Sequence, residues 1–435
     1  MELIIHRGTH QIGGTCIEVS SRGNRILLDI GLPLDFDDRI AAIGRGEQTD
    51  GQALVKEGIL PDIAGIYTWN REKPSIHAIL ITHSHYDHYG ILQYVKPEIP
   101  VYMGRDAWSI ITKAALFLLQ EHPFSGAVEP VSSGTPFSTA GFTVTPYLMD
   151  HSAFDAYAYH ITDGEKSIIY TGDFRSHGRK TKAFEWFLNH APKEADALII
   201  EGTMLSRETE HASTEADLEN DVAGMAQKTS GMVLAYCSAQ NIDRLVTFYR
   251  AAKRTGRLFV VDIYTAHILR QAGMHSVIPA PGDVFTDVRV YFPWKLSTQI
   301  ADAGNVHVLY EFVGRKIDKD TIRENQSRIL MTVRPSVKID LKKIGLNPGS
   351  VLIYSLWPGY LEERYVADFV KWLEEQGVET HTIHTSGHAT VETLIKTVNR
   401  LKPKRVIPVH TTAPDEFGKY FTNVEVLSDN TIYQV

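Results

Sequence analysis

Cysteine and long apolar runs are scarce in this sequence. Its 435 residues include two cysteines, Cys16 and Cys237, which are too few for a disulfide framework and lack the paired spacing of a zinc finger. We expect two small buried side chains in a reducing, cytoplasmic setting. No apolar run approaches the roughly 18 residues that a membrane span needs, and the first residues lack the regions of a signal peptide. The sequence therefore predicts no membrane partner.

An excess of positive charge is also missing. The 44 basic and 52 acidic residues give a formal net charge of −8, which argues against a protein that coats nucleic acid by bulk charge. This balance leaves room for a local basic groove, with candidate pieces at 175–182, 253–257 and 402–405, although such runs are more often solvated faces. With 43% hydrophobic and 22% charged residues, the composition is globular, and the length suits two domains.

Two patterns of secondary structure follow one another along the chain. Up to about residue 200, short apolar strands stand between Gly, Asp and Asn turns, with one helix near 106–120. From about Thr214, amphipathic helices alternate with fully apolar strands, which is typical of a parallel sheet. The expected helices of this part are 214–228, 242–254 and 361–375, and the expected strands are 232–236, 258–261 and 351–354. The chain then returns to strands, at 405–409 and 424–427, which predicts an inserted domain.

A cluster of metal-binding residue types follows the apolar strand 78–81. Three histidines and one aspartate stand within six residues, in His83-Ser84-His85-Tyr86-Asp87-His88. Imidazole and carboxylate ligands suit zinc, with manganese as the alternative. A chance run of surface histidines is the simplest alternative in a chain that has 19 of them. We expect His83 and His85 to bind one ion, and Asp87 and His88 to bind the other.

Two adjacent ions need further ligands from other strand ends. His151 follows the expected strand 144–148, and Asp173 follows the expected strand 167–170. A lone histidine is more often structural, but beside the first cluster we assign His151 as a ligand. Asp173 is the natural bridge, because one carboxylate can bind two ions. The sequence therefore predicts two divalent metal ions as the cofactor.

These motifs resemble the metallo-β-lactamase superfamily, which also has an early aspartate matched by Asp29. Three later stretches, Glu201-Gly202-Thr203, IHTSGHA at 383–389 and KPKRVIPVH at 402–410, resemble its β-CASP branch, and ribonuclease J most closely. The resemblance implies an α/β fold, with a metallo-β-lactamase αββα sandwich formed by residues 1–205 and 381–435. An inserted, parallel β-CASP-like α/β domain would span residues 206–380. The chain differs from ribonuclease J at Thr411-Thr412, where Gly-Glu is usual, and we expect it to lack the C-terminal extension of that family.

The same resemblance implies catalytic roles. His410 would complete the second metal site. His388, oriented by Glu201, would protonate the leaving oxygen, and we count Asp87 with these two as catalytic.

Substrate contacts are also implied by the resemblance. His384 and Ser386 would bind a 5′-terminal phosphate, although a tight turn at Gly387 that only presents His388 explains the segment equally well. Ser238 and Asn241 stand in a segment that resembles a further substrate loop.

The implied function is a metal-dependent ribonuclease that acts on single-stranded RNA as a 5′-to-3′ exonuclease, an endonuclease or both. His410 favours RNA, because DNA-directed nucleases of the branch commonly have valine at that position. A small-molecule hydrolase of the lactonase or thioesterase type needs no inserted domain. A diiron redox protein would have glutamate in place of His85, and an inactive scaffold would have lost metal ligands that are all present here. A homodimer is left open.

Overall fold

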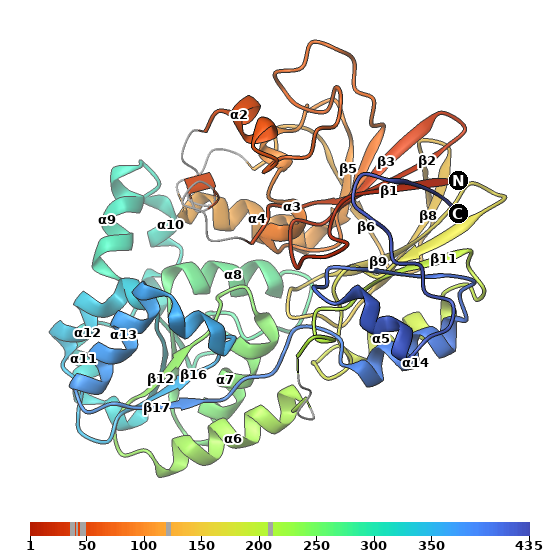
Figure 1. Cartoon of the computed structure of the whole chain (residues 1–435). Coiled ribbons are helices and arrows are strands. Elements are labelled where there is room, and N and C mark those ends of the chain that lie inside the picture. The colour runs from red at the N-terminus through yellow and green to blue at the C-terminus, as the bar shows by residue number, and fades with distance from the viewer. Residues whose placement is uncertain (35–39, 41, 44–48, 119–122, 208–211) are drawn as a thin grey trace. The chain divides into compact units, whose positions relative to one another are not determined.

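The computed structural model describes residues 1–34, 40, 42–43, 49–118, 123–207 and 212–435. The chain forms two compact units (Figure 1). The first comprises Met1–His211 and Gly387–Val435, and the second comprises Ala212–Ser386. The expected boundaries, after residues 205 and 380, lie a few residues before these divisions.

Two sheets form the centre of the first unit. One has seven strands in the order β19-β1-β2-β3-β4-β5-β6. Pairing is antiparallel from β19 to β3 and parallel from β3 to β6. The strands are β19 (Ile432–Gln434), β1 (Glu2–Arg7), β2 (Cys16–Ser21), β3 (Asn24–Ile30), β4 (Ala78–Leu80), β5 (Val101–Gly104) and β6 (Val128–Val131).

The second sheet has six strands in the order β18-β11-β10-β9-β8-β7. The parallel neighbours β10, β11 and β18 end at the same edge of the sheet. Asp173 follows β10 there, His410 follows β18, and Glu201 is the last residue of β11. The other pairs are antiparallel. The strands are β18 (Val406–Val409), β11 (Ala197–Glu201), β10 (Ser167–Tyr170), β9 (Tyr157–Thr162), β8 (Phe142–Leu148) and β7 (Phe137–Thr139).

Apolar side chains from both sheets pack between them, with Leu28 and Leu80 from the first and Tyr159 and Ile199 from the second. Helix α4 (Arg105–Phe117) packs on the outer face of the first sheet, where α2 (Gly51–Lys56) and α3 (Tyr86–Tyr89) also lie. Helices α5 (Thr181–His190) and α14 (Val391–Leu401) lie side by side on the outer face of the second sheet (Figure 1). The layers are helix, sheet, sheet and helix, so the predicted αββα sandwich is confirmed.

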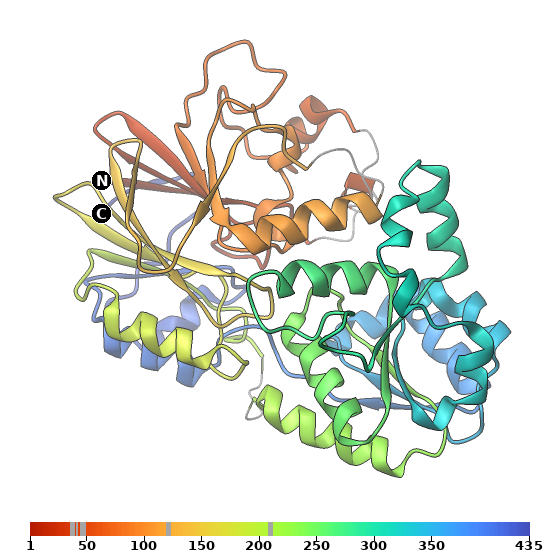
Figure 2. The same ribbon diagram turned by 180° about the vertical axis from the view of Figure 1, so that it is seen from behind.

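The second unit contains one six-stranded parallel sheet between helices (Figure 2). Its order is β14-β13-β15-β12-β16-β17, and every neighbouring pair is parallel. The strands are β12 (Val233–Tyr236), β13 (Leu258–Asp262), β14 (Val288–Tyr291), β15 (Ile329–Thr332), β16 (Val351–Tyr354) and β17 (Glu379–Thr382). The helices are α6 (Glu215–Lys228), α7 (Ile242–Arg254), α8 (Ile263–Gly273), α9 (Trp294–Asp302), α10 (His307–Tyr310), α11 (Lys319–Glu324), α12 (Lys338–Ile344) and α13 (Arg364–Glu375).

The alternating pattern predicted this sheet only in part. It did not predict β14, β15 or β17, and the last of these has the polar sequence ETHT. The expected strand 424–427 is wrong, because there only Val424 forms a bridge, to Val406. Val426 remains 38% exposed, so this segment has little apolar burial to hold it against the sheet. None of the described helices has the length and apolar character needed to cross a membrane.

Candidate metal centre

The HSHYDH segment begins three residues after the end of β4, where the chain turns into α3. Asp87 and His88 lie on α3 and are buried. Gly31, directly after β3, allows this close approach, because a Cβ atom there would stand 1.6 Å from the Asp87 carbonyl oxygen. Two adjacent strands of the first sheet therefore hold α3 in place.

His83, His85 and His151 form the first group of ligand atoms, all within 4.8 Å of one another. His151 Nε2 lies 3.3 Å from His85 Nδ1. On its other side, His151 Nδ1 lies 2.7 Å from the Gly387 carbonyl oxygen, which can only accept, so Nδ1 carries the proton. The Nε2 lone pair of His151 is therefore available to an ion.

Asp87, His88 and His410 form a second group. His410 Nε2 lies 3.1 Å from Asp87 Oδ2, and the Thr203 hydroxyl lies 2.9 Å from His410 Nδ1. That hydroxyl donates to the His410 carbonyl oxygen, so it can accept the Nδ1 proton. His410 itself has φ +53°, an uncommon backbone conformation of the kind that is concentrated at functional sites.

Asp173 lies between the two groups. Its Oδ2 atom is 3.2 Å from His88 Nε2 and 3.9 Å from His83 Nε2, and its Oδ1 atom is 3.5 Å from His410 Nδ1. One carboxylate thus faces histidines of both groups, which is the position that a bridging ligand requires.

Asp29 supports the site from behind. It accepts hydrogen bonds from the Thr82 amide at 2.7 Å, the Tyr170 hydroxyl at 2.7 Å and His88 Nδ1 at 2.8 Å. With its Nδ1 proton bound there, His88 keeps Nε2 directed toward Asp173. Tyr170 and Thr82 were not identified from the sequence, because nothing local to either one indicates this contact.

Glu201 orients the segment that carries His388. Its Oε1 atom accepts from the amides of Phe174 and Ala389, at 3.0 and 3.1 Å. Its Oε2 atom lies 3.1 Å from His388 Nδ1. His388 Nδ1 is also 3.6 Å from Asp173 Oδ2, so this imidazole stands beside the two groups of ligand atoms.

The donor set fits divalent cations. Within the described chain, the buried atoms His83 Nε2 and Asp173 Oδ1 have no hydrogen-bond partner. Buried polar atoms are nearly always satisfied, so these two atoms fit a site at which an ion completes the set of partners. Imidazole nitrogens and carboxylate oxygens at this spacing are ligands for zinc and similar ions.

Protonation favours the same interpretation. Burial lowers the pKa of His85 to about 4 and holds the pKa of His83 and His151 well below the usual range, so all three imidazoles are neutral at pH 7, the form that binds a metal ion. Burial also lowers the pKa of His388, but Glu201 and Asp173 outweigh it and raise the value to about 9. His388 therefore carries a proton at neutral pH.

The four predicted substrate contacts lie in the second unit. Ser238 is exposed after β12, and Asn241 caps α7 by accepting from the Arg244 amide at 3.0 Å. His384 and Ser386 follow β17. Buried Arg244 donates to the Thr385 carbonyl oxygen at 3.3 Å and pairs with Glu215 at 3.1 Å, so the 384–386 segment is tied to α6 and α7. The sequence did not indicate this buried ion pair.

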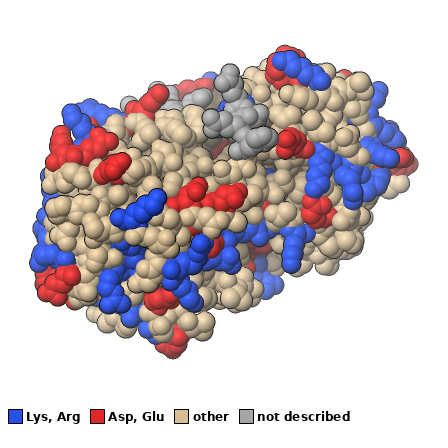
Figure 3. Space-filling model, turned by 90° about the horizontal axis from the view of Figure 1, so that it is seen from below, with Lys and Arg blue, Asp and Glu red and all other residues tan. Residues whose placement is uncertain are grey.

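Basic and acidic side chains are interspersed on the face that Figure 3 shows. Arg175 and Arg257 are buried, so the prediction that they could line a nucleic-acid groove is wrong. Arg175 faces Asp150, and Arg257 donates to backbone carbonyl groups. Lys404 pairs with Asp196 at 2.9 Å.

Residues 62–236 match the family described as "Beta-lactamase superfamily domain", and residues 378–420 match "Zn-dependent metallo-hydrolase RNA specificity domain". Ribonuclease J of Mycobacterium tuberculosis (strain CDC 1551 / Oshkosh) is 23% identical over 424 residues, which is 93% of this chain and 68% of the relative. Ribonuclease J 1 of Streptococcus pyogenes serotype M3 is 23% identical over 93% of this chain and 67% of its own length. The chain thus spans about two thirds of these relatives.

A crystal structure of a protein of unknown function from Enterococcus faecalis V583 superposes with a TM-score of 0.79 at 20% identity, covering 99% of both chains. That likeness shows the fold. Together with the family matches and the His/Asp groups at the strand ends, it confirms the predicted resemblance. The chain thus resembles the β-lactamase superfamily over residues 62–236 and the RNA specificity domain of the Zn-dependent metallo-hydrolases over residues 378–420.

Proposed function

We propose that this protein is a metal-dependent ribonuclease that cleaves single-stranded RNA at a two-metal centre. The observation that carries the proposal is the position of Asp173 between two groups of ligand atoms, with protonated His388 beside it. The RNA specificity match includes both His388 and His410, and the relatives named ribonuclease J match over most of this chain. A cytoplasmic location fits the two free, buried cysteines.

The proposed ligands divide as the geometry suggests. His83, His85 and His151 would hold one ion, Asp87, His88 and His410 would hold the other, and Asp173 would contact both. The ions, when bound, would lower the pKa of water so that hydroxide is available at neutral pH to attack phosphorus, and would stabilise the charge on the phosphoryl oxygens. Zinc is the first choice for this donor set, and manganese is the alternative.

His388 would act as the general acid. The His388 Nδ1–H group would donate a hydrogen bond to Glu201, so the proton on Nε2 would be the one transferred to the leaving oxygen of the RNA. Asp87 would contribute through its carboxylate as a ligand, because its pKa is held at about 2 and it is a weak base. Ser238, Asn241, His384 and Ser386 are proposed as contacts to the RNA or to its 5′-phosphate.

The test is cleavage by protein of measured zinc or manganese content. Substrates are 5′-monophosphorylated and 5′-hydroxyl single-stranded RNA, the matching DNAs, a lactone and a thioester, each beside a His388→Ala control. Cleavage of RNA that His388→Ala slows by about 10²–10⁴-fold is expected. Turnover of the lactone or thioester alone would replace this proposal with a small-molecule hydrolase, and equal or faster cleavage of DNA would replace it with a DNA-directed nuclease.

Two finer points follow from the same experiment. Mononucleotide products and faster cleavage of 5′-monophosphorylated RNA would indicate a 5′-to-3′ exonuclease and favour phosphate contacts at His384 and Ser386. Internal fragments would indicate an endonuclease. Light scattering coupled to size-exclusion chromatography measures whether the protein forms the homodimer that the sequence left open.

A further inference from the structure

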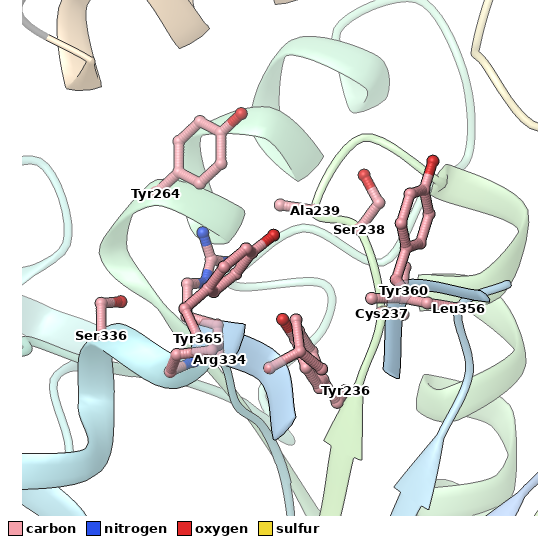
Figure 4. Close-up of a pocket in the computed structure, with 12 residues that line it drawn as sticks. Tyr236, Cys237, Ser238, Ala239, Tyr264, Arg334, Ser336, Leu356, Tyr360 and Tyr365 are labelled. Atoms are coloured by element: carbon pink, nitrogen blue, oxygen red, sulfur yellow. The ribbon is translucent and has the colours of Figure 1, made fainter. Parts of the chain in front are cut away.

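A pocket of about 470 Å³ lies at the carboxyl ends of the strands of the second unit (Figure 4). Segments that follow three of these strands line it, namely 237–239 after β12, 334–336 after β15 and Leu356 after β16. Its volume falls in the range of roughly 300–1,000 Å³ that is typical of ligand sites.

The strand order explains why a pocket forms there. β12 is the first strand of this unit, and it lies between β15 and β16. From β12 the chain passes to β13 and β14 on one side, and later to β16 and β17 on the other side. Where the strand order reverses in an open parallel sheet, the connecting segments diverge and leave a crevice that commonly binds ligands.

Aromatic rings form much of the pocket wall. Tyr236 is buried and makes edge contacts with Tyr354 and Phe369. Tyr360 and Tyr365 are 37% and 61% exposed, so their rings remain accessible to a ligand. Tyr360 lies between β16 and α13, and Tyr365 lies in the first turn of α13; Figure 4 shows both tyrosines at the pocket. A flat π surface of this kind is what a nucleobase stacks on.

Arg334 supplies a positive charge that is already fixed in direction. Its Nη2 group donates to Asp262 Oδ2 and to the Thr265 hydroxyl, both at 2.9 Å, and its guanidinium lies 5.1 Å from the centre of the Tyr264 ring. Among the described residues, its Nη1 and Nε groups donate to no protein atom, and the side chain is 26% exposed. These donors are available to a phosphate or carbonyl oxygen.

We propose that this pocket binds one nucleotide unit of single-stranded RNA, with the base stacked on Tyr365 and an oxygen of the nucleotide bound by Arg334. The proposal rests on the ribonuclease function for its choice of ligand, and it adds a binding site for a nucleotide of the substrate. Exposed tyrosines beside a guanidinium suit a base and its phosphate, and stacking of this kind tolerates any base.

The experiment measures RNA affinity separately from cleavage. A fluorescein-labelled, single-stranded 12-nucleotide RNA is titrated with metal-loaded His388→Ala protein, and its anisotropy gives the Kd. Adding Tyr365→Ala is expected to raise the Kd by about 5- to 100-fold, whereas Tyr365→Phe, which keeps the ring, leaves it within about twofold. Tyr310→Ala is the matched control, because Tyr310 is 69% exposed in the same unit and does not line the pocket.

Each outcome decides one point. Equal Kd values for Tyr365→Ala and Tyr310→Ala overturn the proposal, and Tyr365→Leu repeats the test if thermal melting shows that the alanine variant is unfolded. If AMP or UMP binding depends on Tyr365 but the Kd for RNA does not, the RNA assignment is overturned in favour of a free nucleotide.

Cleavage is then assayed with His388 restored. RNA binding that depends on Tyr365 without cleavage removes the ribonuclease function alone, whereas cleavage with a KM that Tyr365→Ala leaves unchanged removes the pocket alone.

Discussion

Asp29 shows how one buried residue can determine the geometry of a centre to which it contributes no ligand. Its carboxylate joins Thr82 and His88, from the segment after β4, to Tyr170 at the end of β10, and it does so from φ +55°. Asparagine tolerates that backbone conformation well, so the contribution of the charge can be tested without backbone strain.

Asp29→Asn is expected to lower zinc affinity by about 10- to 100-fold, because the amide holds the His88 Nδ1 proton less strongly than a carboxylate does. Competition with a chromogenic chelator measures this affinity. The control is Asp163→Asn, a carboxylate remote from the ligands that accepts from the Ser21 hydroxyl. Affinities that agree between the two variants would contradict the role given to Asp29.

Glu18 should make the free energy of unfolding depend on pH in the acidic range. It pairs with Arg25 at 2.7 Å and His6 at 3.1 Å, and although burial opposes it, these partners lower its pKa from 4.5 to about 2. A depressed carboxyl pKa adds stability above pH 4.5, and this contribution disappears as the pH falls through about 2. Glu18→Gln should therefore destabilise metal-free protein by about 2–3 kcal/mol at pH 7 and by much less near pH 2.

Urea unfolding of the reference protein and Glu18→Gln at pH 7, 4 and 2.5 measures the effect. A difference in unfolding free energy that stays constant over this range would show that Glu18 acts by packing and not by charge.

At the scale of elements, the position of α3 depends on the glycine at the end of β3. The Thr15 amide donates to the Asp87 carbonyl oxygen at 3.2 Å, and the Leu32 amide donates to the Tyr86 carbonyl oxygen at 3.2 Å. There is no room for a side chain at residue 31 without displacing this backbone.

Gly31→Ala is therefore expected to displace Asp87 and His88, to reduce the bound metal to well below that of the reference protein, and to lower stability by about 1–3 kcal/mol. Elemental analysis and thermal melting measure both effects. Gly224→Ala is the control, because no atom lies within 4 Å of a Cβ built there in α6, and it should be neutral or stabilise by about 0.5–1 kcal/mol. Full metal content in Gly31→Ala would disprove the steric argument.

At the scale of the whole molecule, metal binding should stabilise one unit and not the other. Every proposed ligand lies in the first unit, and the second has its own apolar core around Leu234, Met331 and Leu352. Calorimetry with and without a chelator is expected to show a lower melting temperature for one transition and no change in another, because a ligand stabilises only the unit that binds it. An equal shift of all transitions, or no shift at all, would contradict this separation.

The sequence by itself determined the ligand motif and the alternation of helices and strands, because both are local. The expected ligands at 83–88 lie within six consecutive residues. Helix α7 has the bounds that the spacing of its apolar residues predicted. The sequence did not predict β17, because its polar residues show no alternation of apolar and polar positions. The predicted strand 424–427 was wrong, because only Val424 forms a bridge there. Secondary structure that depends on a neighbouring strand leaves no such local pattern.

Only the tertiary structure decided which distant groups meet. The contacts of Asp29 with Tyr170, of Glu201 with the Ala389 amide, and of Gly31 with the Asp87 backbone each join segments that are separate in sequence. They arise because strand ends of both sheets bring these segments together: β3 and β4 lie side by side in the first sheet, and β10, β11 and β18 end at one edge of the second. A single sequence records the residue types at such an edge but not their distances, since distances follow from how the sheets pack.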